Sequence, residues 1–225
     1  MDKKPYYLAY EDRYRQVHEK GLLWLGNKPT PEVSRFLNRY NCSKNQSILE
    51  VGCGEGRDSL FLLSEGFNVL GTDSSLEAIE TCNRLSDNKY INNFMCLDFI
   101  ESNLNKTFDF IYSVAVLHML VEDVHRDMFF KFIKKHLDEN GKALIMVIGD
   151  GEQEMKTDTT KAFELVKRCH EETDTEINIA STSCRVVKWE HLFNEVKRNG
   201  FKLLSNELIL DSPGFSSCMS IVISI

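Results

Sequence analysis

Three glycines at alternate positions, surrounded by acidic residues, form the most informative stretch of the chain. Residues 47–63 read SILEVGCGEGRDSLFLL, with Gly52, Gly54 and Gly56 directly after an apolar run. Glycine lets the backbone approach a ligand closely and adopt conformations that other residues avoid. A glycine-rich turn between a strand and a helix is where nucleotide cofactors bind in α/β folds. The stretch therefore predicts a nucleotide site.

The charge of this loop indicates which kind of nucleotide it binds. Glu50 ends the apolar run, Glu55 lies within the loop, and Asp58 follows it. Arg57 stands where the dinucleotide fingerprint G-x-G-x-x-G has its third glycine. Acidic surroundings repel a pyrophosphate and favour a cationic ligand. S-adenosyl-L-methionine fits, because it is a nucleoside that carries a sulfonium and an ammonium and no phosphate.

Two further acids follow later apolar runs. Asp73 ends FNVLGTD, 23 residues after Glu50, and a carboxylate at about this spacing accepts hydrogen bonds from ribose hydroxyls. Asp98 follows INNFMCL, where it can accept a hydrogen bond from the adenine amino group, with Phe99 or Leu97 against the ring. Three strand ends in chain order thus offer a loop, a ribose carboxylate and an adenine carboxylate.

Each of these residues also has a purely structural interpretation. Asp73 is a suitable N-cap for the helix that follows, and Ser74 or Ser75 can cap it while also contacting the cofactor. Asp98 alone is an ordinary loop acid, and the glycine loop alone is an ordinary turn. The acidic residues that follow the loop at successive strand ends favour a binding site over these structural alternatives.

Strands and helices alternate from Ser47 onward, and they must position these residues. Strands are expected at SILEVG, FNVLGTD, INNFMCLDF, FDFIYSVAVLHML and KALIMVIGD, with helices between them. This repeat predicts right-handed crossovers and a parallel sheet that is covered on both faces. FKLLSNELIL and SSCMSIVISI, joined by a Pro-Gly turn, predict an antiparallel hairpin at the sheet edge.

The runs ILEVGCGEG, VLGTDSS, CLDF and FDFIYSVAVLHML resemble the motifs of class I S-adenosylmethionine-dependent methyltransferases. GCGEGRDSLFL with VLHML is most similar to the small-molecule, tellurite-resistance-type and thiopurine-type branches. The resemblance covers roughly residues 46–150. It implies an α/β fold, a Rossmann-like three-layer α/β/α sandwich with a mostly parallel seven-stranded sheet whose last strand is antiparallel.

The resemblance also implies roles for individual residues. The glycine loop would lie along the methionine part of the cofactor, Asp73 would hold the ribose, and Asp98 with Phe99 would hold the adenine. The strand around Ser113 and Val114 would pass under the cofactor. The cofactor-binding residues expected from the motifs and the charge argument together are Glu50, Gly52, Cys53, Gly54, Asp73, Ser74, Ser75, Asp98, Phe99 and Val114.

The rest of the chain carries weaker signals. Residues 1–45 predict an N-terminal helical extension or lid, and residues 46–225 the Rossmann-like domain. Within it, residues 151–187 predict an insertion that covers the pocket, with a helix over 160–171. Such a segment after the fifth strand lies above the strand ends where ligands bind.

Four polar or aromatic residues outside the cofactor motifs are candidates for the acceptor side of the pocket. His118, after the fourth strand, is positioned to act as a general base, or it packs under the following helix and shapes the pocket. Tyr14 and Trp24 form an aromatic lid, or they pack the N-terminal helix on the core. Asp150 lines the pocket, or it lies in a solvated loop.

Composition narrows the function further. The net charge of −7 over 225 residues argues against nucleic acid as the main partner, because phosphate binding needs a basic face. No run is long and apolar enough for a membrane-spanning helix, and MDKKPYY lacks the apolar core of a secretory signal. Seven scattered cysteines without a C-x-x-C pair indicate free thiols in the cytoplasm and no metal site. The edge hairpin is compatible with a monomer or a homodimer.

The function expected is methyl transfer from S-adenosylmethionine to a small-molecule thiol, amine, hydroxyl or oxyanion, with S-adenosylhomocysteine as product. One alternative is a methyltransferase acting on RNA or protein, although SVAVLH replaces the N-P-P-Y-type signature of base-amino methyltransferases. A second alternative is an NAD enzyme, against which Arg57 and the acidic loop argue. A third is a regulator that binds the cofactor without turnover.

Overall fold

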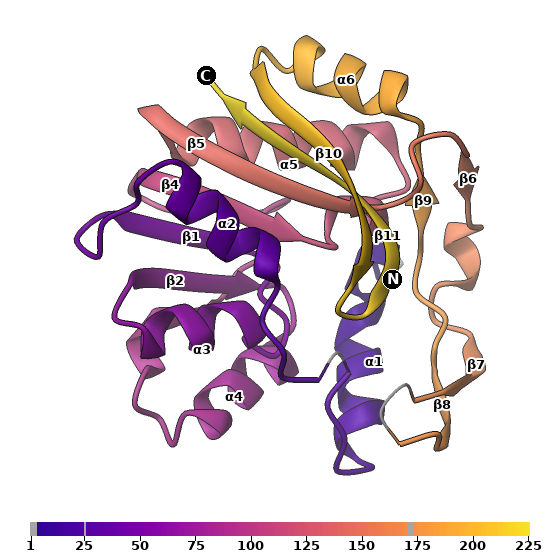
Figure 1. Cartoon of the computed structure of the whole chain (residues 1–225). Helices are drawn as coiled ribbons and strands as arrows, with labels where there is room; N and C mark the ends of the chain where they lie inside the picture. Colours follow the sequence, from indigo (N-terminus) through magenta and orange to yellow (C-terminus); the bar gives the residue numbers. More distant parts are fainter. Residues whose placement is uncertain (1–3, 25, 171–172) are drawn as a thin grey trace.

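A seven-stranded sheet runs through the centre of the computed structural model, which describes residues 4–24, 26–170 and 173–225. The strand order is β10-β11-β5-β4-β1-β2-β3 (Figure 1). The strands are β1 (Ser47–Val51), β2 (Asn68–Asp73), β3 (Phe94–Cys96), β4 (Phe108–Val114), β5 (Leu137–Ile148), β10 (Lys202–Ser212) and β11 (Phe215–Ser224). β1, β2, β3, β4 and β5 pair in parallel, whereas β11 runs antiparallel to both β5 and β10. The predicted fold class and the edge hairpin are therefore confirmed.

Helices cover both faces of the sheet (Figure 1). The α-helices are α1 (Ala9–His18), α2 (Pro31–Arg39), α3 (Arg57–Ser64), α4 (Leu76–Leu85), α5 (Asp123–His136) and α6 (Trp189–Arg198). Short 3₁₀ helices are η1 (Tyr6–Leu8), η2 (Ile91–Asn93), η3 (Leu117–Met119) and η4 (Thr159–Lys161). None of the described helices has the length and apolar character needed to cross a bilayer.

The apolar strand runs follow from burial on both faces. Ile48 of β1 packs into the layer of α2, α3 and α4, whereas its neighbour Leu49 packs into the layer of α5 and α6. Phe110 and Ile111 of β4 divide in the same way. Successive side chains of a strand point to opposite faces, so a central strand of a three-layer sandwich is apolar along most of its length.

The two N-terminal helices take separate places. α2 belongs to the sandwich, where Phe36 packs edge-on against Phe110 with 5.7 Å between ring centroids. α1 instead lies beyond the carboxyl ends of β1 and β2 (Figure 1). Of the two α-helices in the predicted N-terminal extension, α1 therefore lies at the strand ends, whereas α2 belongs to the sandwich; the role of a lid stays a prediction.

The helix predicted over 160–171 is wrong. η4 ends at Lys161, and β7 (Leu165–Cys169) then pairs antiparallel with β8 (Glu176–Ala180); position 171 lies outside the described residues. A second short pair joins β6 (Met155–Lys156) to β9 (Arg185–Val186). Ile177 and Ile179 alternate along β8 and are buried against Val17 of α1. This long-range packing favours the hairpin over the local helix.

Candidate active site

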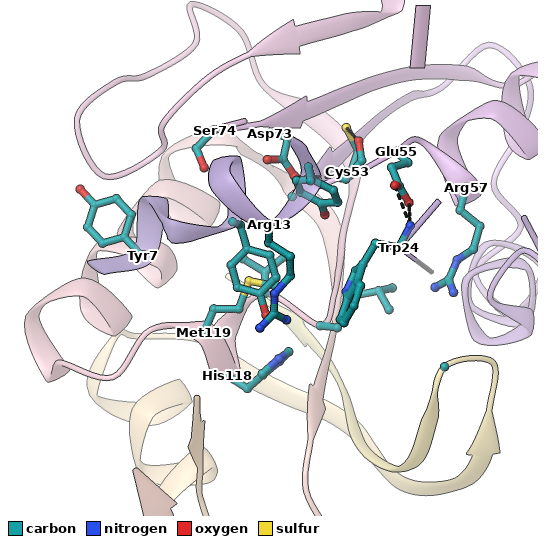
Figure 2. Close-up of a pocket in the computed structure, with 18 of the residues that line it drawn as sticks. Tyr7, Arg13, Trp24, Cys53, Glu55, Arg57, Asp73, Ser74, His118 and Met119 are labelled. Atoms are coloured by element: carbon teal, nitrogen blue, oxygen red, sulfur yellow. Dashed lines mark hydrogen bonds between the residues drawn. The ribbon is translucent and has the colours of Figure 1, made fainter. Parts of the chain in front are cut away.

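A cavity of about 330 Å³ opens at the carboxyl ends of β1, β2 and β4. α1, β7 and the turn between β10 and β11 contribute residues to its lining as well. Figure 2 shows side chains from distant parts of the chain around one space, among them Arg13 of α1, Asp73 at the end of β2 and His118 of η3. Of the residues that the sequence predicts for the site, Ser75 and Asp150 do not line the cavity, and all the others do.

The glycine loop turns sharply between β1 and α3. Gly52, Gly54 and Gly56 have φ angles of 76°, 52° and 80°, in the left-handed region that other residues rarely adopt. A Cβ atom on Gly52 would lie 2.2 Å from Val116 Cγ2, and one on Gly54 would lie 2.7 Å from the hydroxyl oxygen of Tyr14. The first two glycines are therefore required by space as well as by backbone conformation.

Asp73, at the end of β2, is oriented by the backbone around it. Its Oδ2 accepts a hydrogen bond from the Gly54 amide at 2.8 Å, and its Oδ1 accepts one from the Ser75 amide at 2.9 Å. Burial raises the pKa of Asp73 to about 6, against the effect of these two donors. Ser75 itself caps α4, since its side chain accepts a hydrogen bond from the Ala78 amide at 3.1 Å.

Glu50 is buried in β1 beneath the loop. It accepts hydrogen bonds from Ser59 Oγ and, at 2.9 Å, from the hydroxyl of Tyr112. Burial, and then the negative charge of Asp58, raises the pKa of Glu50 to about 8. A cation in the cavity would stabilise the ionised form of this carboxyl group.

Asp98 and Phe99 follow β3 at the far end of the cavity. Asp98 Oδ1 accepts a hydrogen bond from the Ile100 amide at 2.9 Å, which fixes the turn. The Phe99 ring packs edge-on against Phe129 of α5, with 5.6 Å between centroids. Val114 lines the cavity from the end of β4. Asp98 and Phe99 also line the cavity, and their role in binding adenine stays a prediction.

The opposite side of the cavity is basic and aromatic, and the sequence analysis missed most of it. Arg13 and Tyr10 of α1 and Arg168 of β7 line this side with Trp24. Arg13 and Tyr10 are three positions apart on α1, so helical spacing could have placed them on one face. No local signal marks Arg168, because the segment that carries it forms a strand rather than the predicted helix.

His118, in η3, also lines this side (Figure 2). It is 4 % exposed, and its buried Nδ1 has no hydrogen-bond partner among the described residues. Burial, followed by the charges of Arg126 and Arg13, lowers the pKa of His118 to about 3. The imidazole is therefore neutral throughout the physiological pH range.

α1 and the segment after it are fastened to the glycine loop through Glu55. The Trp24 amide donates to both carboxylate oxygens of Glu55, at 2.8 and 3.0 Å (Figure 2). His18 Nε2 lies 2.8 Å from Glu55, and its Nδ1 lies 2.7 Å from Glu77 of α4. Burial opposes a charge on His18, but the two glutamates outweigh it and raise its pKa.

Asp150 has a local structural role. Its Oδ1 accepts hydrogen bonds from the amides of Glu152 and Gln153, both at 2.9 Å, and closes the turn after β5. These two donors lower the pKa of Asp150. The surroundings of Asp150 therefore match the interpretation in which it lies in a solvated loop.

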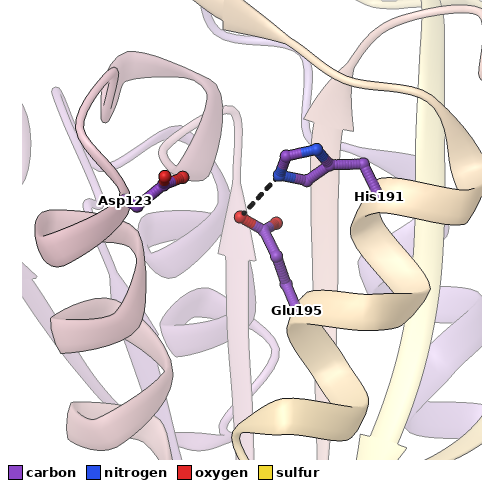
Figure 3. A group of neighbouring side chains, drawn as sticks. All are labelled: Asp123, His191 and Glu195. Carbon is purple, nitrogen blue, oxygen red and sulfur yellow. Dashed lines mark ion pairs between the residues drawn. The ribbon is translucent and has the colours of Figure 1, made fainter.

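Among the described residues, Asp123, His191 and Glu195 form a cluster with donor spacing suited to a metal ion (Figure 3). Arginines already neutralise it. Arg126 donates to both carboxylate oxygens of the fully buried Glu195 at 2.6 and 2.7 Å. Arg185 contacts Asp123 at 2.7 Å. The cluster does not line the cavity, and its charges join α5 to α6.

Comparisons with known proteins agree with this geometry. A family model described as a methyltransferase domain matches residues 24–206. The chain is 29% identical over 117 residues to a ubiquinone biosynthesis O-methyltransferase of Rickettsia canadensis, covering 52% of this chain and 48% of that protein. It is 30% identical over 100 residues to the probable S-adenosyl-L-methionine-dependent methyltransferase TehB of Haemophilus influenzae, covering 44% and 35%. Each match thus spans less than half of the relative's length.

A solved structure matches over nearly the whole chain. It is the 1,6-didemethyltoxoflavin-N1-methyltransferase of Burkholderia thailandensis, with bound 1,6-didemethyltoxoflavin and S-adenosylhomocysteine. The TM-score is 0.68 at 15% sequence identity, over 98% of this chain and 90% of that one. The family match covers most of the chain and the sheet has the expected topology, so the chain belongs to the methyltransferase-domain family, in the class I S-adenosylmethionine-dependent group.

Proposed function

We propose that this chain transfers a methyl group from S-adenosylmethionine to the nucleophile of a small molecule. The observation that carries the proposal is the charge division of one covered cavity. Glu50, Asp73 and Asp98 line it from the ends of β1 and β2 and from the residues after β3, whereas Arg13 and Arg168 line it from α1 and β7. The acidic residues suit the sulfonium and ammonium of the methyl donor, and the basic residues suit an anionic group.

The acidic side fits S-adenosylmethionine. Gly52 and Gly54 line the cavity without side chains that would fill it, and Asp73 keeps lone pairs for ribose hydroxyls beyond its two amide bonds. Glu50, held by two hydroxyl donors, would face the positive charge of the cofactor's ammonium group. Asp98 and Phe99 would hold the adenine. The bound cofactor supplies an already activated methyl group.

The protein's own contribution to the reaction is position and the exclusion of water. Methyl transfer from a sulfonium is an in-line displacement, so aligning the acceptor supplies a large share of the rate. Tyr14, 5 % exposed and packed over Gly54, closes the cavity beside the loop. A thiol or neutral amine acceptor needs little help from a base, and a neutral His118 can accept or donate a hydrogen bond there.

The cover over the cavity supports a small acceptor. α1, β7 and the turn at Gly214 and Phe215 all contribute to its lining, and an RNA or protein chain would have to displace them. The net charge of −7 also disfavours nucleic acid. The Burkholderia enzyme named above holds a small molecule. A cytoplasmic location is part of the proposal, because all seven cysteines are free.

Calorimetry and a turnover screen test the proposal. We expect S-adenosylmethionine and S-adenosylhomocysteine to bind with dissociation constants on the order of micromolar, roughly −8 kcal/mol. Thiols, amines, phenols and oxyanions are then screened for release of S-adenosylhomocysteine. No binding of either ligand refutes the proposal. Binding without turnover on any small molecule indicates a regulator, and tight retardation of RNA in low-salt gels indicates a macromolecular acceptor.

A further inference from the structure

Arg13 is a buried cation that has no acidic partner among the described residues. It is 5 % exposed, and it donates only to backbone carbonyl oxygens: Nε and Nη2 to Ala180 at 3.1 and 2.8 Å, and Nη2 to Ser181 at 2.6 Å. Its Nη1 donates to no residue that the structure describes. Buried charges in proteins are normally paired, so this guanidinium has a free pair of donors and an uncompensated charge inside a cavity.

The guanidinium is held rigidly in place. Its carbon lies 5.0 Å from the ring centroid of Tyr10 and 4.7 Å from that of Trp24. The Ala180 amide, next to the carbonyl that Arg13 contacts, donates to Gln16 Oε1 at 2.7 Å. Arg13 therefore needs little reorganisation to bind an anion, which strengthens such binding. Figure 2 shows the side chain extending from α1 toward His118.

Two more groups point to an anionic, hydrogen-bonding ligand. Arg168 brings a like charge to the same side of the cavity, close enough to lower the pKa of Arg13 after the effect of burial. His118 is nine-tenths buried in the cavity wall and lacks a described partner at Nδ1. The buried charge of Arg13 and the unpartnered imidazole of His118 are costly to keep unless a ligand completes them.

The acidic residues that line the cavity do not supply the anionic partner that Arg13 and Arg168 call for. Glu55 contacts His18 and Trp24, and Asp58 accepts hydrogen bonds from the amide and hydroxyl of Thr30. The remaining acids lie at the strand ends, on the side assigned to the cationic donor.

We infer that the methyl acceptor is a small organic acid whose carboxylate binds Nη1 of Arg13, with Arg168 as the second cation and His118 contacting another polar group of the acceptor. The aromatic surfaces of Tyr10, Trp24 and Phe215 favour an organic body over a bare inorganic oxyanion. This inference rests on the proposed function. In the transfer, the bond from methyl carbon to sulfur breaks and one to the acceptor's nucleophilic atom forms. Sulfur keeps the electron pair, and the acceptor's proton leaves to solvent.

Matched pairs of candidate acceptors test this inference. Thiols, phenols and amines are compared as carboxylates and as the corresponding carboxamides, by calorimetric titration into the S-adenosylhomocysteine complex and by turnover. Carboxylates are expected to bind at least tenfold more tightly than their amides. Equal binding of the pairs, or no binding of any carboxylate to a complex that forms normally, overturns the inference. Turnover of inorganic oxyanions alone overturns it too. Failure of the complex to form refutes the proposed function instead.

Two variants separate recognition from folding. Arg168→Gln, at an exposed position of β7, is expected to raise KM for carboxylate acceptors about tenfold with little change in kcat or in cofactor affinity. Lys167→Gln, its exposed neighbour that does not line the cavity, is the control and should leave KM unchanged. Arg13→Met should abolish carboxylate binding in the folded protein. An Arg168→Gln variant that matches the control overturns the role of Arg168, and carboxylate binding that survives in both arginine variants overturns the inference.

Discussion

Cofactor affinity should rise with pH, because Glu50 must ionise to face a cation. The free protein holds this buried carboxyl with a pKa of about 8. Such a group is ionised to about one part in ten at pH 7, about half at pH 8 and about nine parts in ten at pH 9. The apparent dissociation constant is the intrinsic constant divided by the competent fraction. It should therefore fall roughly fivefold from pH 7 to 8 and about tenfold from pH 7 to 9.

Glu50→Gln is the matched perturbation. Glutamine keeps an oxygen acceptor for Ser59 and Tyr112 but does not titrate. The variant should bind S-adenosylhomocysteine more weakly than the wild type at pH 9 and lose the rise in affinity. Because both proteins are titrated with the same ligand, comparing their pH profiles removes the contribution of the ligand's own ionisation. Asp73, with a pKa of about 6, should add pH dependence mainly below pH 7 in both proteins.

Isothermal titration calorimetry at half-unit intervals from pH 6 to 9 gives the two profiles. Titration at pH 7 in buffers with different ionisation heats should show close to one proton released per wild-type binding event, because about nine-tenths of Glu50 is protonated beforehand. Superimposable profiles for wild type and Glu50→Gln would refute the reasoning. So would an affinity that is constant from pH 6 to 8.

Three further outcomes are expected. Gly66→Ala, at a position with φ of 83° and open space around it, should lower the free energy of unfolding by about 1–2 kcal/mol. Gly52→Ala combines a positive φ with a lack of space, so it should lower the free energy of unfolding more and weaken cofactor binding. Equal losses in denaturant titrations of the two variants would contradict this expectation. His18→Gln should lose the most stability below about pH 6.5. The stabilisation from a raised histidine pKa is present there and is lost as the pH rises through that pKa. A larger loss of unfolding free energy at pH 8.5 than at pH 5.5 would contradict this prediction. Arg126→Leu should reduce the free energy of unfolding by roughly 3–5 kcal/mol, because it removes the guanidinium that binds both carboxylate oxygens of the buried Glu195. The double variant with Glu195→Leu should recover most of this loss.

The local sequence was sufficient to predict the sheet and the acidic residues that line the cavity. The central strands β1 and β4 are largely apolar because both of their faces are buried. The glycine loop and Asp73 lie within one β1–α3–β2 unit. Their geometry therefore depends on neighbours in the chain. The capping role of Ser75 also follows from a local pattern.

The basic side of the cavity depends on contacts between distant segments. Arg13 is placed by the carbonyls of Ala180 and Ser181, which no short pattern connects to it. β7 and β8 form because Ile177 and Ile179 bury against α1, so the local helical signal over this region was misleading. The expectation that Asp150 faces the pocket did not anticipate its turn-closing amide bonds.

Consecutive residues of α1 serve both halves of the cavity, since Tyr14 packs over Gly54 while Arg13 points to the basic side. A ligand that holds one of these side chains in place also holds α1, the helix that carries the other side chain. If donor and acceptor bind as proposed, occupancy of one half should tighten binding in the second half, by a factor that is the same in either direction. Product departure should accordingly be sequential, with the spent nucleoside retained longer while the methylated acid still occupies its place.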